Sequence, residues 1–190
     1  MNKLLKVIES LTNNEVIKSI INSVNDNQEK CKDWLINKLH VYLTEIKKPK
    51  ICVAAGWYGS LANKLKTYSK SKVLTFDMDP QTKVIGEKIY NDILFEVNKI
   101  ETFKNYKKYN VFVCTSCEHL TKDTFDNMLS ELNDGTLVAL QSNDYFGVDG
   151  HINCHKNLKE FIGSVKFKQV LYYGELTLKK YTRFMIIGIK

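Results

Sequence analysis

Residues 51–80, ICVAAGWYGSLANKLKTYSKSKVLTFDMDP, decide the fold that we expect for this chain. The stretch opens with a short apolar run, turns tightly at Gly56 and Gly59, predicts a helix over residues 60–69, and closes with a second apolar run that stops at Asp77. The order strand, glycine turn, helix, strand and acid is the opening unit of a nucleotide-binding α/β domain. We therefore expect the rest of the chain to continue the same sheet.

The glycines and the acid of this stretch indicate a class of ligand. Gly56 and Gly59 allow positive φ and let a ligand contact the main chain beside the first turn of the next helix. Asp77 lies 21 positions after Gly56, where the second strand ends beside the first. A carboxylate there can accept hydrogen bonds from both hydroxyls of an adenosine ribose. The pattern predicts an adenosine-containing ligand.

The composition of the turn narrows the choice of ligand. A dinucleotide site requires G-x-G-x-x-G around its pyrophosphate, whereas Trp57 and Tyr58 fill the space between only two glycines here. The phosphate-cradling sequence G-x-x-x-x-G-K-[ST] is absent as well. A ligand with a ribose and an adenine but no phosphate remains, and S-adenosylmethionine is the common one.

Several motifs resemble those of a known family. VAAGWYGSLA (53–62) and FDMDP (76–80) are similar to motif I and the acidic loop of class I S-adenosylmethionine-dependent methyltransferases. TSCEH (115–119) and HINC (151–154) resemble segments of small phage-encoded proteins assigned to that class. The resemblance covers about residues 30–190. The sequence departs from the family pattern at two positions near the cofactor. The acidic residue that usually opens motif I is absent before Ala54 and Ala55, and Asn98 stands where many relatives carry a carboxylate near adenine.

The turn, the acid and the resemblance together give a predicted cofactor site. Trp57 and Tyr58 are expected to wall the methionine end, with Met78 and Asn98 near adenine. The full predicted set is Ala55, Gly56, Trp57, Tyr58, Gly59, Asp77, Met78, Asn98, Thr115 and Ser116.

Length, cysteines and charge restrict the class of protein. The 190 residues suit one compact domain. No apolar run reaches the roughly 20 residues of a membrane span, and the first ten residues lack a cleavable leader pattern.

Five cysteines, an odd number, favour reduced thiols and a cytoplasmic location over a disulfide framework. The formal charge of +7 is the excess of 28 basic over 21 acidic residues. All the basic residues except Arg183 are lysines, which favours a solvated lysine coat over a nucleic-acid surface.

The periodicity of the chain predicts a helical cap over residues 1–47 and a Rossmann-like core over residues 48–190. Apolar residues at helical spacing predict two short helices, then a third over residues 29–46 after a polar break at 25–28. In the core we expect strands at 51–55, 72–76, 94–97, 110–114 and 136–141, with helices at 60–69, 82–90, 121–132 and 156–165.

The end of the chain distinguishes two kinds of nucleotide-binding sheet. Runs 167–178 and 181–189 are too close for a crossover helix, so the two strands must be antiparallel. A mostly parallel sheet with a C-terminal antiparallel hairpin is, as the resemblance implies, the class I methyltransferase sheet rather than that of a dehydrogenase.

Polar residues at the end of the strand 110–114 are candidates for chemistry. Ligands of open α/β sheets lie at the carboxyl ends of the strands. Glu118 can orient a methyl acceptor or take its proton, and His119 can act as a base at neutral pH. The alternative is that Thr115 and Ser116 cap a turn while Glu118 and His119 form a surface ion pair.

A second polar cluster follows the strand 136–141 and includes QSN (141–143) and HINC (151–154). Its loop is long for a strand-to-helix connection, as a substrate lid would be. The predicted substrate residues are Asn143, Tyr145, His151 and Asn153; alternatively Asn153 or His151 caps the next helix. We expect no metal, because the paired C-x-x-C and H-x-x-x-H spacings of structural zinc are missing, and we expect Cys114 to point into the core.

The sequence thus predicts an S-adenosylmethionine-dependent methyltransferase acting on an N or O acceptor, with RNA, a nucleotide or a small molecule all open. Nothing resembles the N-P-P-Y motif of amino-group DNA methylation, so sequence-specific duplex DNA is disfavoured. Two alternatives remain: a non-catalytic cofactor-binding subunit, and a nicotinamide-dependent oxidoreductase, which the missing third glycine disfavours.

Overall fold

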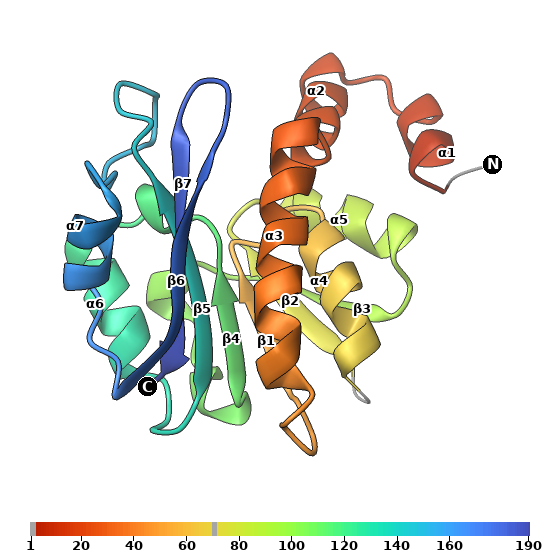
Figure 1. The fold of residues 1–190 in the computed structure, drawn as a ribbon. Coiled ribbons are helices and arrows are strands. Elements are labelled where there is room, and N and C mark those ends of the chain that lie inside the picture. The colour runs from red at the N-terminus through yellow and green to blue at the C-terminus, as the bar shows by residue number, and fades with distance from the viewer. Residues whose placement is uncertain (1–2, 70–71) are drawn as a thin grey trace.

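A seven-stranded sheet forms the centre of the computed structural model, which describes residues 3–69 and 72–190. The strand order is β3-β2-β1-β4-β5-β7-β6 (Figure 1). Strands β1 to β5 are mutually parallel, whereas β7 runs antiparallel to both β5 and β6. The predicted fold class, including the C-terminal hairpin, is confirmed. The strands are β1 Ile51–Ala54, β2 Val73–Asp77, β3 Ile93–Val97, β4 Val111–Cys114, β5 Leu137–Asn143, β6 Gln169–Thr177 and β7 Thr182–Ile189.

Side-chain caps fix the start of most helices. Asn13, Asn25, Asp79, Thr121 and Asn157 each accept a hydrogen bond from a backbone N–H of the first turn, which satisfies a donor that has no partner within the helix. The helices are α1 Lys3–Glu9, α2 Asn14–Ser23, α3 Asp26–Leu43, α4 Ser60–Leu65, α5 Pro80–Ile89, α6 Lys122–Ser130 and α7 Leu158–Gly163.

Helices cover both faces of the sheet. Helices α3, α4 and α5 lie on one side, and α6 and α7 on the other (Figure 1). The central strands β1 and β4 are buried on both faces, which is why their sequences are continuous apolar runs. The first face buries Leu35, Leu39, Leu43, Leu61 and Leu65 against the sheet. The second face buries Phe125, Met128, Leu129 and Phe161.

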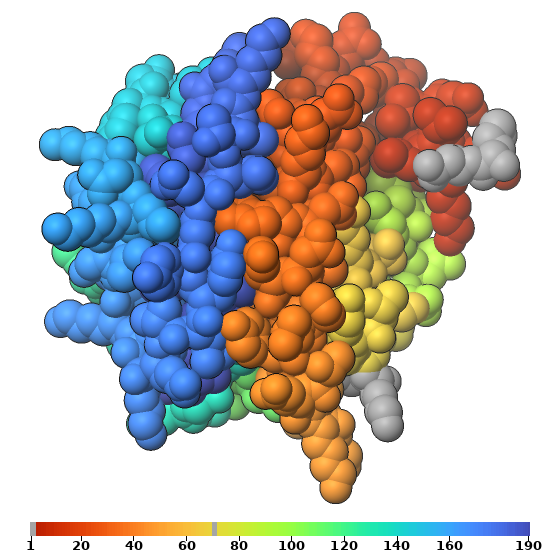
Figure 2. All heavy atoms as spheres, in the orientation of Figure 1, coloured from red at the N-terminus to blue at the C-terminus, as the bar shows by residue number. Residues whose placement is uncertain are grey.

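The three N-terminal helices divide between two packing roles. Helix α3 lies beside the C-terminal hairpin (Figure 2). There the Tyr42 hydroxyl donates to the Leu171 carbonyl at 2.9 Å and the Trp34 ring meets Tyr172 edge-on. Helices α1 and α2 instead pack on a small cluster with Tyr58 and α5. The division into a cap (1–47) and a core (48–190) stays a prediction.

Several predicted boundaries are wrong, for local reasons. The predicted break between the second and third helices exists but covers residues 24–25 rather than 25–28, because the Asn25 side chain caps α3 and the helix begins at Asp26. Strand β5 continues two residues beyond its predicted end, since Ser142 and Asn143 pair with Phe184 and Arg183. The predicted helix 60–69 is α4 followed by a 3-10 turn at 66–68, and the predicted helix 156–165 shortens to α7.

All five cysteines lie in the described ranges and are free, and Cys114 is buried as expected. Among the described residues, no helix combines the length and the apolar character that crossing a membrane would require.

Candidate active site

A cavity of about 780 Å³ opens at the carboxyl ends of β1, β2, β4 and β5, beneath the α2–α3 junction. This is the edge where open α/β sheets bind ligands. It brings together most of the predicted site residues: Ala55, Gly56, Trp57, Tyr58, Asp77, Met78, Asn98, Thr115, Ser116, Glu118, His119, Asn143, Tyr145 and His151. Gly59 and Asn153 are not among its lining residues.

The β1–α4 turn is held close to the neighbouring strand. Ala55 and Trp57 have positive φ (48° and 52°), an uncommon conformation for residues with a side chain. The Gly56 amide donates to the Phe76 carbonyl at 3.1 Å. A Cβ on Gly56 would lie 1.9 Å from the Thr75 hydroxyl oxygen, so only glycine fits.

Asp77 is fixed by main-chain donors and keeps hydrogen-bonding capacity. Its Oδ2 accepts the Trp57 amide at 3.0 Å and its Oδ1 accepts the Asp79 amide at 3.2 Å. Burial raises the pKa of Asp77, while these amide donors act in the opposite direction. Because a carboxylate oxygen has two lone pairs, each oxygen can accept one more hydrogen bond from a ligand.

The aromatic pair of the turn is anchored to α2. The Trp57 indole N–H and the Tyr58 hydroxyl both donate to Ser19 Oγ, at 3.2 and 3.0 Å. Tyr58 is only 3% exposed and packs with α1, α2 and α5. The predicted role of these rings, to wall the methionine end of a cofactor, stays a prediction.

The predicted adenine neighbours lie beside Asp77. The Asn98 amide donates to the Asp77 carbonyl at 3.0 Å, and the Asn98 side chain donates to Glu96 Oε2 at 3.1 Å. The Glu96 carboxylate thus lies beside Asn98, but Glu96 is not among the lining residues of the cavity. Met78 is 65% exposed at the rim. Gly59 lies behind the turn, against the Phe95 ring.

A buried network of Glu118, Asn143 and Arg183, called here the ion-pair network, forms the floor of the cavity. Arg183 Nη1 donates to Glu118 Oε1 at 2.8 Å, and Nδ2 of the Asn143 side chain donates to the same oxygen at 2.7 Å. The Glu118 and Arg183 side chains are 4% and 5% exposed. Burial is the largest single effect on the pKa of Arg183 and acts to lower it, but the acidic neighbours Glu118, Cys31 and Tyr181, with Glu118 the strongest of them, together outweigh burial and raise that pKa. The alternative of a surface ion pair between Glu118 and His119 is wrong.

Arg183 is the functional candidate that the sequence analysis missed. Its Nη1 also donates to the Thr115 carbonyl at 3.2 Å, which ties β7 to the end of β4. A signal for it exists, because the only arginine among 28 basic residues stands at the start of an otherwise apolar strand. A buried charge needs a partner, so such a residue predicts a buried acid nearby.

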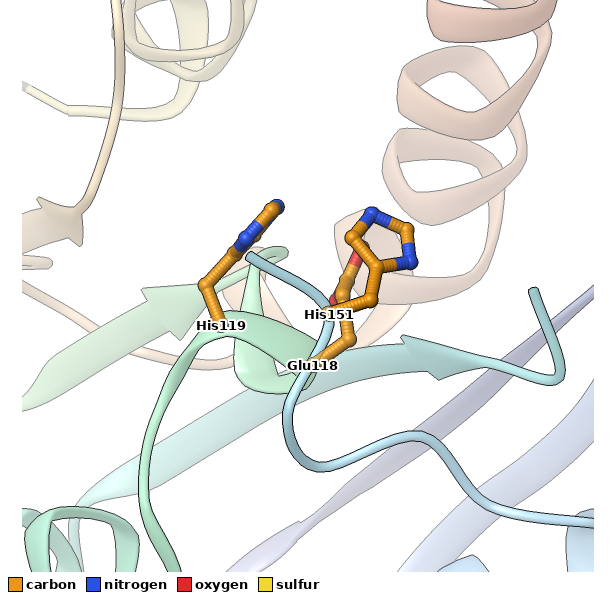
Figure 3. Close-up of side chains that lie close together, drawn as sticks. All are labelled: Glu118, His119 and His151. Carbon is orange, nitrogen blue, oxygen red and sulfur yellow. The ribbon is translucent and has the colours of Figure 1, made fainter. Parts of the chain in front are cut away.

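Two histidines lie at the open side of the network. Nδ1 of His119 is 2.9 Å from the Gly150 carbonyl, and Nδ1 of His151 is 2.9 Å from the Tyr145 carbonyl. Their rings meet edge-on with centroids 4.7 Å apart (Figure 3). A carbonyl oxygen only accepts, so Nδ1 carries the proton in each ring and Nε2 of the neutral ring keeps a free lone pair.

The loop after β5 is folded back on Glu118. The amides of Ile152 and Asn153 both donate to the Glu118 carbonyl at 2.9 Å. Asn153 thus contacts the site through its main chain. The alternative that Asn153 or His151 caps the next helix is wrong, because Asn157 caps α7.

A lysine from α3, which the sequence alone does not indicate as a site residue, lines the wall of the cavity at the α2–α3 junction. Lys32 lines the cavity and pairs with Glu29 at 3.1 Å. Burial lowers its pKa, an effect that Glu29 opposes. Gln28 and Ser23 line the same wall.

Comparison with solved structures finds several of the same architecture. The N-methyltransferase NodS from Bradyrhizobium japonicum WM9, in complex with S-adenosyl-L-homocysteine, matches with a TM-score of 0.70 at 12% identity, over 100% of this chain and 99% of that one. The magnesium protoporphyrin IX methyltransferase ChlM from Synechocystis PCC 6803, with bound S-adenosylmethionine, matches with a TM-score of 0.63 at 14% identity, over 99% and 89%.

The same comparison includes a protein of a different activity. The [4+2]-cyclase SpnF matches with a TM-score of 0.65 at 7% identity, over 86% of this chain and 81% of that one. No family model and no curated protein sequence matches the chain. The finer resemblance to phage-encoded proteins therefore stays a prediction. What the likeness shows is that the chain has the Rossmann-like fold of class I S-adenosylmethionine-dependent methyltransferases.

Proposed function

We propose that the protein is an S-adenosylmethionine-dependent methyltransferase acting on an N or O acceptor. The observation that carries the proposal is a single cavity with two chemically different ends. At one end lie the Gly56 turn and the Asp77 carboxylate, and at the other lie His119, His151 and the ion-pair network. The cavity volume of about 780 Å³ lies in the upper part of the range usual for ligand pockets, about 300–1,000 Å³, and its two ends can hold a cofactor and a small acceptor side by side.

The first end fits the cofactor. The Asp77 oxygens have lone pairs left for two ribose hydroxyls, and the space that a Cβ on Gly56 would need is already taken by Thr75. Glycine is thus required at position 56 by the packing of the turn against β2, which holds the main chain of the turn beside Asp77 at the cavity wall. When bound, S-adenosylmethionine supplies an electrophilic methyl group on a sulfonium centre. A pyrophosphate is disfavoured, because Trp57 and Tyr58 occupy the turn where a dinucleotide site has small residues.

The second end fits an acceptor that loses a proton. Methyl transfer is an in-line displacement, so the protein has to position the acceptor and remove its proton. The acceptor lone pair forms the new bond to carbon, and the pair of the broken bond remains on sulfur. The acceptor proton passes to the free Nε2 of His119, while Glu118 and Asn143 hold the floor in place.

A non-catalytic cofactor-binding protein is the second candidate. A specific observation favours it: Glu118 already accepts hydrogen bonds from Asn143 and Arg183, so this predicted catalytic acid is engaged in structure. The match to a [4+2]-cyclase also shows that this fold is used for reactions other than methylation. Turnover with a labelled methyl group separates the two candidates.

The test is calorimetric titration with S-adenosylmethionine and S-adenosylhomocysteine, with NADH as the control ligand. We expect Asp77→Ala to weaken both adenosyl ligands by at least about tenfold, because two hydrogen bonds to a charged acceptor are lost. The matched control is Asp134→Ala, whose carboxylate is 95% exposed and lies outside the cavity. Wild-type affinity in Asp77→Ala, or tighter binding of NADH, would contradict the proposal.

A further inference from the structure

Three side chains at the acceptor end of the cavity form a group with the chemistry of metal ligands. Glu118, His119 and His151 each offer one ligand atom, and these atoms lie within 4.8 Å of one another. Glu118 and His119 follow β4, whereas His151 comes from the loop after β5 (Figure 3). We propose that these residues, called here the histidine cluster, bind one divalent transition-metal ion whose remaining coordination positions face the cavity.

The hydrogen bonds of the two imidazoles prepare them as ligands. Each Nδ1–H donates to a backbone carbonyl, of Gly150 for His119 and of Tyr145 for His151, at 2.9 Å. This contact fixes the tautomer and the ring orientation and leaves the Nε2 lone pair for the ion. Metal-binding histidines in proteins are held by contacts of the same kind. The centroids of the two rings are 4.7 Å apart, so both imidazoles are available to one ion.

Glu118 supplies an independent indication of a ligand. Its Oε1 accepts from Asn143 and Arg183, but its Oε2 is fully buried and has no hydrogen-bond partner among the described residues. Leaving a carboxylate oxygen buried without a partner costs free energy. Because Glu118 lines the cavity beside both histidines, a cation bound there would satisfy the oxygen.

The ligand atoms of the histidine cluster need to move only slightly closer together to bind one ion. Bonds from a transition metal to imidazole nitrogen or carboxylate oxygen are about 2.0–2.2 Å long, so two ligands of one ion lie at most about 4.4 Å apart. The largest separation here is within 4.8 Å. His119 is exposed, and a small rotation of its side chain is not restricted by core packing.

The ligand set selects the kind of ion. Two imidazoles and one carboxylate suit Zn²⁺, Co²⁺, Mn²⁺ or Fe²⁺ with open positions, whereas Mg²⁺ and Ca²⁺ prefer oxygen ligands throughout. The Arg183 guanidinium on the other Glu118 oxygen repels a cation and weakens its binding. We therefore expect affinity in the micromolar range rather than that of a structural zinc.

The ion would also define the acceptor, a step that rests on the function proposed above. Its open positions would take an oxygen atom of the acceptor, and coordination lowers the pKa of a bound hydroxyl. With Nε2 of His119 occupied by the ion, the acceptor proton would then pass to solvent rather than to His119. Acceptors that carry a hydroxyl or a pair of vicinal oxygens would then be favoured over amines.

The experiment uses Co²⁺ as the probe on protein that has been treated with EDTA and desalted. Calorimetry and visible absorption should report one Co²⁺ bound per chain through nitrogen and oxygen. His119→Ala and His151→Ala should each lower the affinity by at least about tenfold. The matched control is His40→Ala on α3, outside the cavity, which should bind Co²⁺ as the wild type does. Near-ultraviolet circular dichroism confirms that each variant is folded.

Three results would overturn the inference: no saturable Co²⁺ binding, equal affinity in both histidine variants and the wild type, or a sulfur-to-cobalt absorption band that indicates a cysteine site. S-adenosylhomocysteine titration of the metal-free protein keeps this separate from the proposed function. If that ligand binds but Co²⁺ does not, the metal inference alone is overturned. Co²⁺ binding that depends on both histidines, without affinity for the adenosyl ligand, supports the metal site and refutes the methyltransferase.

Discussion

The two ends of the cavity are built in different ways. The cofactor end consists of a turn and an acid 21 positions apart on adjacent strands, held mainly by main-chain hydrogen bonds such as Trp57 N–H to Asp77. The acceptor end is a set of side chains from β4, β5 and β7, and its central contact joins Glu118 to Arg183 across 65 positions. A local motif is recognisable in the sequence, whereas a network of distant side chains becomes visible only in the folded sheet.

The difference predicts that the acceptor end is the more sensitive to single substitutions. Arg183→Met leaves the Glu118 charge buried without its partner, and breaking a buried pair in this way costs about 3–5 kcal/mol of unfolding free energy. Urea denaturation measures the loss. The surface pair Lys122 and Asp126 gives the control, because Lys122→Ala should change stability by less than about 0.5 kcal/mol.

The double variant Glu118→Gln/Arg183→Met sharpens this test. Removing both charges leaves no unpaired ion, so the double variant should be more stable than Arg183→Met alone. If the losses of unfolding free energy of the two single variants simply add in the double variant, Glu118 and Arg183 are not coupled. The contrast between the two ends of the cavity then fails.

The second prediction concerns the cofactor end and its backbone. Gly56→Ala places a Cβ 1.9 Å from Thr75 Oγ1 and should cost about 1–3 kcal/mol, together with a loss of S-adenosylhomocysteine affinity. Adding Thr75→Ala removes the blocking oxygen and should restore much of the stability. Gly163→Ala is the control, since nothing lies within 4 Å of its added Cβ. A Gly56→Ala protein as stable as the wild type would show that the turn is not closely packed.

The difference between local and distant contacts explains which parts of the structure the sequence predicts. Strand periodicity, Gly56 and Asp77 predicted the sheet and the place of the cavity, because each acts within one β-α-β unit. The hairpin followed from the short connection between its strands. The sequence predicts too early an end for β5, because Ser142 and Asn143 are polar and only their pairing with β7 shows that they are in the strand.

The acceptor end could be predicted only in part. Glu118 and His119 stood out because they follow a strand end, but the partner of Glu118 depends on the register of β5 against β7, which places Asn143 opposite Arg183. Helical spacing alone did not show that α2 and α3 cover the cavity with Ser23 and Lys32. The approach of His151 to His119 likewise depends on the path of a loop.

The third prediction tests whether the cofactor end also relies on distant side chains. Ser19→Ala removes the acceptor shared by the Trp57 indole and the Tyr58 hydroxyl, and should lower stability by about 1 kcal/mol. Urea denaturation and Trp57 fluorescence report the change. Ser130→Ala, at the exposed end of α6, is the control. An unchanged urea midpoint in Ser19→Ala would mean that the hydrogen bonds from α2 do not stabilise the turn. The cofactor end would then depend only on contacts close in sequence.

The smallest effect concerns a histidine behind the acceptor end. His155 is 5% exposed, lies 3.0 Å from Ser142 Oγ, and has a pKa that burial holds below its ordinary value of 6.5. The unfolded chain therefore binds this proton at a higher pH than the folded protein does. Stability is fully present above about pH 6.5 and falls as the pH drops toward the lower folded pKa. His155→Gln cannot take up this proton, so the slope of unfolding free energy between about pH 7 and pH 5 should be shallower in the variant. Equal slopes in urea titrations would show that His155 does not contribute to the pH dependence, and that the packing behind the acceptor end tolerates a charge.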